Sequence, residues 1–502
     1  MEKPKTPRPS EVLIPRPLVI VDTPGFFNLA TSSIMFDHVL EQESHLAAIQ
    51  LGSAIHADSL KVRTETTSSI QLRIRVETEA LNECAFRIEI TPLHILCESS
   101  TAEGIWHAVQ ILRQLAMTYG NNIPCCTICD GPHYGYRGLM LDCSRHYFSS
   151  DFITSLIDMI SMLRMNRFHW HLTDDQGWRF PVKTFPNLED VGAWRSENSL
   201  RVGGVYSHKE IQDIVAYAQK RHVMVIPEID MPGHTTAALA AYPDLGCTKG
   251  PYHVPTTWGI FEDVLCAGSN HIIRFMEETY GELANCFTSA YVHIGGDECP
   301  TVRWKSCTAC NELMHRERLR NIESIQGWFT RQAINIISGL NKKAIAWDEV
   351  LESIDPERDT NKLTIMAWRG HKRCQKAVSA GFDVISSLKD DGCYLDYRHT
   401  ADRHERGNIG ITTVRQSYDF SPMKPEDSVY QEQFIGGQGN LWTEYITDPE
   451  EAQYMLFPRL CAISEALWLP VEKKDYDSFV RRWHHHAKRL EALNIRYYQG
   501  EL

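Results

Sequence analysis

The sequence predicts an α/β protein in which a (β/α)8 TIM barrel follows a small α+β accessory domain. Eight short apolar segments recur over residues 133–470, helical patterns separate most of them, and alternating strand patterns precede them. A chain of 502 residues suits a barrel, which takes ~200 to over 400 residues, together with one extra unit. Hydrophobic residues make up 43% of the chain, which is enough for a large core and excludes a disordered protein.

The N-terminal accessory domain is expected to cover residues 1–132. Its first ~12 residues hold three prolines among charged residues and are predicted to be flexible. Apolar and polar residues alternate over 70–77 and again over 86–90, which predicts two neighbouring antiparallel strands. From 102 to 119 the apolar residues recur with the period of a helix. Residues 125–132 are interpreted as a linker that ends in Asp-Gly-Pro.

The barrel domain is expected to cover residues 133–502. Helical patterns at 152–165, 208–221 and 322–340 alternate with strands, and a last helix at 476–493 should pack on the barrel. A doubly wound open sheet is the alternative, but no G-x-G-x-x-G motif follows the first strand. The eight predicted strands lie at residues 138–142, 167–173, 223–228, 291–295, 343–347, 364–368, 382–386 and 434–441.

Composition and charge exclude several classes of function. A net charge of −13 argues against nucleic-acid binding, which needs a basic surface. The sequence contains no run of ~18 apolar residues, so it predicts no membrane span. The 15 cysteines are spread through expected helices and strands, which favours buried thiols over a disulfide framework. No apolar export signal opens the chain, but a chain whose signal had been trimmed would read the same, so the compartment is left open.

Polar and aromatic residues gather where the predicted strands end, which is where TIM barrels carry their active sites. Asp297 and Glu298 end the fourth strand, and Gly295-Gly296 before them predicts a close approach of another group to the backbone. Carboxylates mixed with tryptophans suit a sugar, whose ring offers apolar C–H faces to indoles and hydroxyls to carboxylates. The other candidates at or near strand ends are Arg137, Asp174, His234, Trp347, Trp368, Tyr394, Asp396, Trp442 and Glu444.

Eight motifs stand out over about 133–470: RGLMLDCSRHYF, NRFHWHLTDDQGWR, VIPEIDMPGH, HIGGDE, AWDE, AWRG, CYLDY and GGQGNLWTE. In these motifs and their order the chain resembles family-20 glycoside hydrolases, the β-N-acetylhexosaminidases. The preceding unit, with GIWHAVQILRQL, resembles the accessory domain of that family. The resemblance implies exo-acting removal of terminal non-reducing β-linked GlcNAc or GalNAc from an oligosaccharide or glycoconjugate. It implies no cofactor and no catalytic metal, and a homodimer is an option because some members are dimers.

The resemblance also implies roles at the matching positions. Glu298 is expected to be the general acid/base, Asp297 to orient the 2-acetamido group of the substrate, and Tyr394 to hydrogen-bond its carbonyl. Trp347, Trp368 and Trp442 should wall the pocket. Arg137, Asp396 and Glu444 should hold the sugar hydroxyls. Asp174 and His234 should support Glu298 from behind.

Adjacent carboxylates at one strand end predict an unusual form of catalysis. An ordinary retaining glycosidase places its two carboxyl groups ~5–5.5 Å apart across the anomeric carbon, and consecutive residues are poorly placed for that. The acetamido oxygen of the substrate can instead act as the nucleophile, which gives an oxazolinium intermediate and retention of configuration. Glu298 must begin protonated, so we expect burial and neighbouring acids to raise its pKa.

Three alternatives stay open from sequence alone. A catalytically inactive sugar-binding protein could keep the same fold, and a lacto-N-biosidase-like specificity could keep the same site. A metal-dependent hydrolase is the third, because His169, His171, His234 and His293 fall at strand ends.

A separate candidate for a metal site is a cysteine group after the fourth strand. Cys299, Cys307, Cys310 and the nearby His315 could hold a structural zinc ion, with a disulfide or free thiols as the alternatives.

Overall fold

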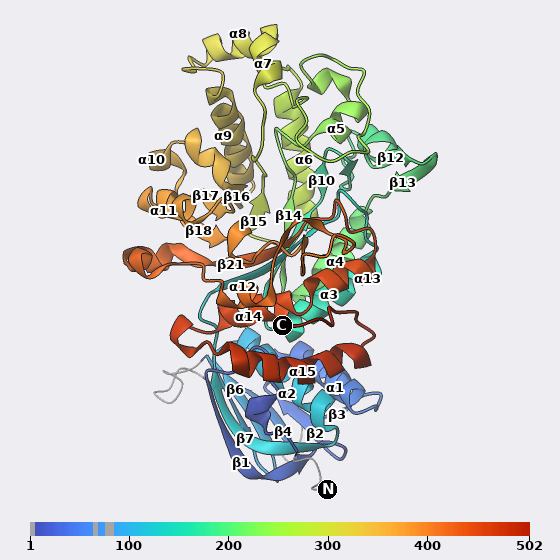
Figure 1. The fold of residues 1–502 in the computed structure, drawn as a ribbon, viewed down its shortest axis with the longest axis vertical. Helices are drawn as coiled ribbons and strands as arrows, with labels where there is room; N and C mark the ends of the chain where they lie inside the picture. Colours follow the sequence, from blue (N-terminus) through green and yellow to red (C-terminus); the bar gives the residue numbers. More distant parts are fainter. Residues whose placement is uncertain (1–5, 64–68, 76–84) are drawn as a thin grey trace.

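The computed structural model describes residues 6–63, 69–75 and 85–502, which form an N-terminal sheet with its helices and a closed barrel above it (Figure 1). The last helix, α15 (Tyr476–Ala492), lies between the two parts and contacts helix α2 (Ala102–Tyr119). Among the described residues, no helix is both long and apolar enough to cross a membrane.

Within the described residues, the N-terminal sheet has seven strands in the order β1-β7-β5-β6-β4-β2-β3. Helix α2 packs against β5, β6 and β7, and its predicted bounds are confirmed. Thr101 begins this helix because its side chain accepts a hydrogen bond from the Gly104 N–H at 3.1 Å. The elements of this part are β1 (Val19–Asn28), β2 (Ser33–Phe36), α1 (Glu41–Ala54), β3 (Lys61–Val62), β4 (Ile70–Ile74), β5 (Phe86–Ile90), β6 (Ile95–Ser99), α2 and β7 (Asn122–Asp130).

Two expectations about this sheet are wrong. The stretch interpreted as a linker is mostly strand β7, which pairs with β1 on one side and β5 on the other. Most of its side chains are buried, so it lacks the polar alternation that marks a half-exposed strand. Strands β4 and β5 are not neighbours, because β6 lies between them, parallel to β4 and antiparallel to β5. Val76 and Glu77 of the first predicted strand lie outside the described residues.

The start of the chain also differs from the predicted flexible segment. Pro9–Glu11 form a 3-10 turn, and Val12 and Leu13 are buried. Helix α15 holds this segment, because Arg489 donates to the Val12 carbonyl at 2.7 Å and Arg482 to the Leu13 carbonyl at 2.8 Å. Residues 1–5 lie outside the described residues.

The barrel contains all eight predicted strands, and it closes where β21 pairs in parallel with β8. All seven residues of β8 are buried, as expected of a parallel strand that is covered on both faces. The strands are β8 (Tyr136–Asp142), β9 (Arg167–His171), β14 (Met224–Glu228), β15 (Tyr291–His293), β16 (Lys343–Trp347), β17 (Leu363–Ala367), β18 (Asp383–Ser386) and β21 (Phe434–Leu441).

Helices and short hairpins surround the barrel. Ser149 and Ser207 accept hydrogen bonds from backbone N–H groups in the first turns of α3 and α4, which fixes where these helices begin. The helices are α3 (Ser150–Met162), α4 (His208–Gln219), α5 (Thr236–Ala241), α6 (Ile272–Cys286), α7 (Val302–Ser306), α8 (Thr308–Arg316), α9 (Ser324–Gly339), α10 (Pro356–Asp359), α11 (His371–Ser379), α12 (Val414–Asp419), α13 (Pro449–Leu456) and α14 (Arg459–Trp468). The short strands are β10 (Thr173–Asp174), β11 (Gly177–Trp178), β12 (Trp194–Glu197), β13 (Leu200–Gly203), β19 (Tyr397–Arg398) and β20 (Asn408–Ile411).

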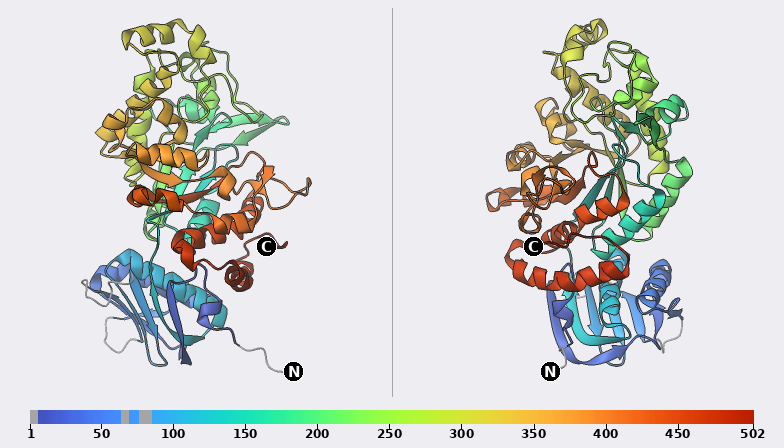
Figure 2. Two further views of the ribbon diagram at one scale, coloured as in Figure 1. Left: turned by 60° about the vertical axis from the view of Figure 1, so that its left-hand side comes forward. Right: turned by 45° about the vertical axis from the view of Figure 1, so that its right-hand side comes forward.

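The N-terminal part lies below the barrel domain in both views of Figure 2 and packs against helix α3 and the start of strand β8. His107 of α2 lies 3.3 Å from the guanidinium of Arg137, the second residue of β8, and its ring packs edge-on against Trp468 at 5.3 Å. The C-terminal ends of the barrel strands carry the long loops that build the candidate site.

Candidate active site

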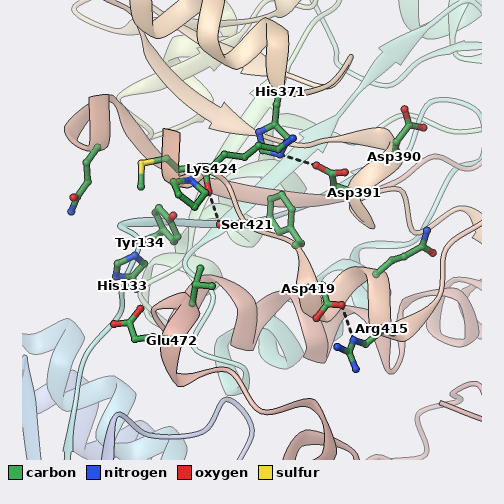
Figure 3. A pocket seen from close by; sticks show the side chains of 16 residues that line it. His133, Tyr134, His371, Asp390, Asp391, Arg415, Asp419, Ser421, Lys424 and Glu472 are labelled. Carbon is green, nitrogen blue, oxygen red and sulfur yellow. Dashed lines mark hydrogen bonds and ion pairs between the residues drawn. The ribbon is translucent and has the colours of Figure 1, made fainter. Parts of the chain in front are cut away.

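A pocket of about 160 Å³ lies among the C-terminal ends of the barrel strands. All the predicted site residues except Arg137 and Asp396 line it, and Arg145, Lys389, Tyr397 and Asn408 join them. A larger cavity of about 580 Å³ lies elsewhere, beside His133, His371 and Arg415 (Figure 3). That cavity contains none of the predicted site residues, so the smaller pocket is where the candidate chemistry is concentrated.

The backbone before the acidic pair wraps tightly around a buried carboxylate. Gly295 and Gly296 have φ of 66° and 95°, and a Cβ atom on Gly295 would lie 1.7 Å from Oδ1 of Asp230. The Gly296 N–H donates to the same oxygen at 3.0 Å. The predicted close approach is thus made by Asp230, and glycine is required because it leaves room and tolerates positive φ.

A chain of carboxylates and imidazoles leads from the barrel interior to Glu298. The two ring nitrogens of His171 lie 2.5 Å from Glu228 and 3.0 Å from Asp174. Nδ1 of His234 lies 3.2 Å from Asp174, and its Nε2 lies 3.6 Å from Oε2 of Glu298. Glu298 and His234 both have left-handed backbones, with φ of 42° and 52°, a strain that is characteristic of functional sites.

This chain of groups sets the charge of the acidic pair. Burial alone would lower the pKa of His234, but the carboxylate of Asp174 raises that pKa well above its ordinary value. The charge of His234, whose Nε2 lies 3.6 Å from Glu298, lowers the pKa of Glu298, so the expected raised pKa is wrong. The reason is that sequence reasoning counted the neighbouring acids but not the imidazolium between them. Burial and the nearby Asp230 instead raise the pKa of Asp297 well above its usual range.

Aromatic rings form the walls of the pocket. Trp347 and Trp442 lie 5.9 Å apart between ring centroids, and Trp368 stacks with Tyr394 at 6.3 Å. The indole N–H of Trp347 donates to Glu228 at 2.9 Å, and that of Trp368 donates to Glu349 at 3.0 Å. These bonds fix the ring planes, which gives a rigid apolar surface for one face of a sugar.

Arg137 is not in the pocket, and the prediction that it binds substrate is wrong. It is the second residue of β8, about 16 Å of strand from the C-terminal end at ~3.3 Å per residue, and it bonds to the carbonyls of Tyr134 and Arg164. The arginine in the pocket is Arg145, which follows β8. It lies 2.9 Å from Asp174 and 3.2 Å from Asp142. The position of Arg145 just after strand β8 is the feature of the sequence that could have identified it as a pocket residue.

Asp396 lies beside the pocket without lining it. Its carboxylate is 2% exposed, and burial together with the charge of Glu444 raises its pKa to about 8. Burial also raises the pKa of Glu444, which lines the pocket. Two carboxyl groups held in this way are well suited to share hydrogen bonds with neutral hydroxyls. Tyr397 ends the CYLDY motif and directly follows Asp396. Lys389 and Asn408 come from the connection between β18 and β21, whose approach to the pocket no local pattern predicts.

The histidines suggested as metal ligands lie mostly beneath the pocket. His169, His171 and His293 are fully buried, and each contacts the carboxylate of Glu228 at 2.5–3.0 Å. Trp347 also bonds to this carboxylate, so the group is a buried network that supports the pocket wall.

Family models match both parts of the chain. Residues 134–471 match the catalytic domain of glycosyl hydrolase family 20, and residues 11–131 match domain 2 of the same family. The chain belongs to glycosyl hydrolase family 20. By this membership it has the fold of a glycoside hydrolase, and similar curated proteins are β-hexosaminidases.

Known family-20 proteins are similar over nearly the whole chain. A β-hexosaminidase of Porphyromonas gingivalis is 35% identical over 97% of this chain, which spans 64% of that longer relative. A β-N-acetylhexosaminidase of Cellulomonas fimi is 30% identical over 98% of this chain and 96% of its own length. A Vibrio harveyi exo-β-N-acetylglucosaminidase in complex with N-acetylglucosamine is 28% identical and superposes with a TM-score of 0.89 over 99% of this chain and 80% of its own.

Proposed function

We propose that this family-20 enzyme removes terminal non-reducing β-linked GlcNAc or GalNAc from oligosaccharides or glycoconjugates by substrate-assisted, retaining hydrolysis. One observation carries the proposal: Oδ1 of Asp297 is buried beside Glu298 and has no hydrogen-bond partner among the residues that the structure describes. An unpaired buried acceptor costs about 1–3 kcal/mol. The N–H of a bound 2-acetamido group would supply the missing donor.

The residues of the pocket then divide the reaction between them. The acetamide oxygen attacks the anomeric carbon while Glu298 protonates the glycosidic oxygen, and the aglycone leaves. Asp297 accepts the amide N–H and stabilises the positive charge of the oxazolinium, and Tyr394 orients the acetamide oxygen. Glu298 next takes a proton from water, which attacks the anomeric carbon from the face that the aglycone left and breaks the bond from that carbon to the acetamide oxygen. The product keeps the β configuration.

The exposure and the charge of Glu298 fit a site that the substrate completes. Its side chain is 35% exposed, and His234 holds it as a carboxylate. A bound sugar would cover Glu298 and remove its water, which raises the pKa of a carboxyl group toward that of a general acid. Asp174 and His234 position Glu298 through this change, while Arg145, Asp396 and Glu444 hold the hydroxyls of the sugar.

The shape of the site supports action on one terminal sugar. The pocket of about 160 Å³ adjoins a cavity of about 730 Å³ that shares Glu298 and Trp368 with it. The small pocket suits the sugar to be removed, and the open cavity would receive the rest of the substrate. We assign catalysis to residues 133–502 and an accessory role to residues 1–132. A homodimer remains a prediction that light scattering would test.

The decisive experiment compares substrates that differ only at the 2-position. Hydrolysis of p-nitrophenyl β-GlcNAc and β-GalNAc is expected, and turnover of the β-glucoside should be lower by orders of magnitude. An oriented internal nucleophile can lower the barrier by ~7–11 kcal/mol, and the glucoside lacks it. A thiazoline analogue of the oxazolinium should inhibit strongly. Comparable hydrolysis of the β-glucoside, or first release of the α-anomer by NMR, would overturn the mechanism. Binding without any turnover would favour the inactive sugar-binding protein.

The role of Glu298 is tested by Glu298→Gln, which keeps the shape but removes the proton donor. Hydrolysis of a disaccharide should fall by ~10²–10⁴-fold, and that of a p-nitrophenyl glycoside by less, because phenolate leaves with little acid help. Glu277→Gln on the exposed side of α6 is the matched control and should change neither rate. Equal losses on the two substrates would contradict the acid role.

A further inference from the structure

Four cysteines meet at the start of α8, outside the catalytic pocket. Helices α7 and α8 lie near the top of Figure 1. Cys247 and Cys266 come from the loop between α5 and α6, and Cys307 and Cys310 lie at the start of α8. Ligand atoms of all four lie within 4.8 Å of one another. The sequence analysis proposed Cys299, Cys307, Cys310 and His315 as zinc ligands. Among the described residues, Cys307 and Cys310 belong to this group, whereas Cys299 and His315 do not.

The spacing of the sulfur atoms matches a tetrahedral metal site. The Sγ–Sγ distances are 3.5 Å for Cys266–Cys310, 3.6 Å for Cys266–Cys307 and 3.8 Å for Cys247–Cys310. Four thiolates at the zinc–sulfur distance of ~2.3 Å occupy tetrahedron corners about 3.8 Å apart. A disulfide needs ~2.05 Å, and Cys266 lies almost equally far from two possible partners. One ion at the centre accounts for these distances better than any pairing.

The surroundings of the cysteines suit a closed, buried site. Cys310 is fully buried and Cys266 is 4% exposed, while Cys247 and Cys307 are partly exposed. Cys307 is the N-cap residue of α8, and Cys310 lies in its first turn, where backbone N–H groups favour negative charge. The two segments approach closely, since a Cβ atom on Gly268 would lie 2.2 Å from the backbone of Ala309.

We propose that Cys247, Cys266, Cys307 and Cys310 bind one structural Zn²⁺ ion. Four thiols lose their protons and leave no open coordination position, so the ion stabilises structure and does not act on substrate. It would join the long loops that follow β14 and β15, the strands that lead to His234 and to Asp297 and Glu298. These loops also supply Ile260 and Thr301 to the 730 Å³ cavity beside the acid. The ion therefore braces one wall of the cleft.

The test measures metal in the full-length protein. Plasma mass spectrometry should find about one zinc per chain, and a zinc indicator should detect its release when a mercurial blocks the thiols. Cys266→Ser and Cys310→Ser should lose the zinc and lower the melting temperature. Cys374→Ser is the matched control, because Cys374 is a fully buried cysteine outside the cluster, and it should keep the full zinc content.

Measurements on the wild-type protein keep the test decisive if the serine variants fail to fold. Replacement of the bound ion by Co²⁺ should give the intense near-ultraviolet absorption of thiolate-to-cobalt charge transfer and the visible bands of a tetrahedral site. A metal-free protein with four thiols reactive at this cluster would overturn the proposal. So would an intact mass that shows disulfides among these four cysteines. Iron in place of zinc would overturn the identity of the ion.

Discussion

Arg145 is the arginine that lines the pocket, and its partners hold it rigidly. Its guanidinium lies between Asp142 and Asp174 and over the ring of Trp442, 5.2 Å from the ring centroid. A planar guanidinium can bond both carboxylates and still offer N–H groups to a sugar hydroxyl, whereas an ammonium group cannot span the same partners. The contribution of this residue therefore depends on its shape as well as its charge.

We predict that Arg145→Lys lowers kcat/KM for p-nitrophenyl β-GlcNAc by roughly 10- to 150-fold. This corresponds to the ~1.5–3 kcal/mol of a hydrogen bond to a charged group. Steady-state kinetics measure the loss, and calorimetry should show a melting temperature close to that of the wild type. The lysine keeps the positive charge beside Asp142 and Asp174, so the fold should survive.

Arg137→Lys is the matched comparison and should behave in the opposite way. Arg137 donates hydrogen bonds to the carbonyls of Tyr134 and Arg164 near the start of strand β8. Its loss should lower the melting temperature and leave kcat/KM within about twofold. If Arg137→Lys instead impairs kinetics while Arg145→Lys only destabilises, the assignment of the two arginines is reversed.

At the scale of elements, a strand that is buried on both faces can be predicted from the sequence when it belongs to a series in which strands and helices alternate. Each of the eight barrel strands is a short apolar run that ends in chemically informative residues, and the regular spacing identifies the series. Strand β7 is also mostly buried, but it precedes a turn and lies in no repeating series, so its composition suggests a linker instead of a strand. Contacts between distant segments had no local signal, as for Cys247 and Cys310, which lie 63 residues apart.

Helix α2 carries a histidine, His107, at the contact between the N-terminal part and the barrel. Burial lowers the pKa of His107 to about 4, although Glu103 acts against this, and Arg137 and Arg164 act with it. The unfolded chain binds this proton near pH 6.5, while the folded chain does not bind it until about pH 4. The stability that comes from a neutral His107 is therefore complete above pH 6.5 and is lost as the pH falls toward 4.

We predict that His107→Gln reduces the loss of stability on acidification. A shift of this size corresponds to about 3 kcal/mol, so the wild type should lose about that much more than the variant between pH 6.5 and 4. Denaturant unfolding at several pH values measures the difference. His45→Gln on the exposed face of α1 is the control and should follow the wild type. Parallel pH profiles for wild type and His107→Gln would contradict the prediction.

At the scale of the whole molecule, a buried ion pair ties the N-terminal sheet to the barrel. Asp130 at the end of β7 accepts hydrogen bonds from the Leu18 N–H at 3.0 Å and from the indole of Trp468 at 2.9 Å. Its other oxygen lies 2.5 Å from Arg164, which also donates to the carbonyl of Pro15. Asp130 and Arg164 are both fully buried, so neither part can separate without exposing one charge and stranding the other.

We therefore predict that the two parts unfold together, in a single calorimetric transition. Asp130→Asn keeps the shape of the side chain but leaves Arg164 as an uncompensated buried charge, which costs about 3–5 kcal/mol. With the unfolding entropy of a chain of this length, at ~2.1 cal/mol/K per residue, the single transition should fall by roughly 3–5 °C. Asp58→Asn, on an exposed loop of the N-terminal part, should leave it unchanged. If the variant shows two transitions and only one of them moves, the N-terminal part unfolds independently, and Asp130 is a local support instead of a link between the two.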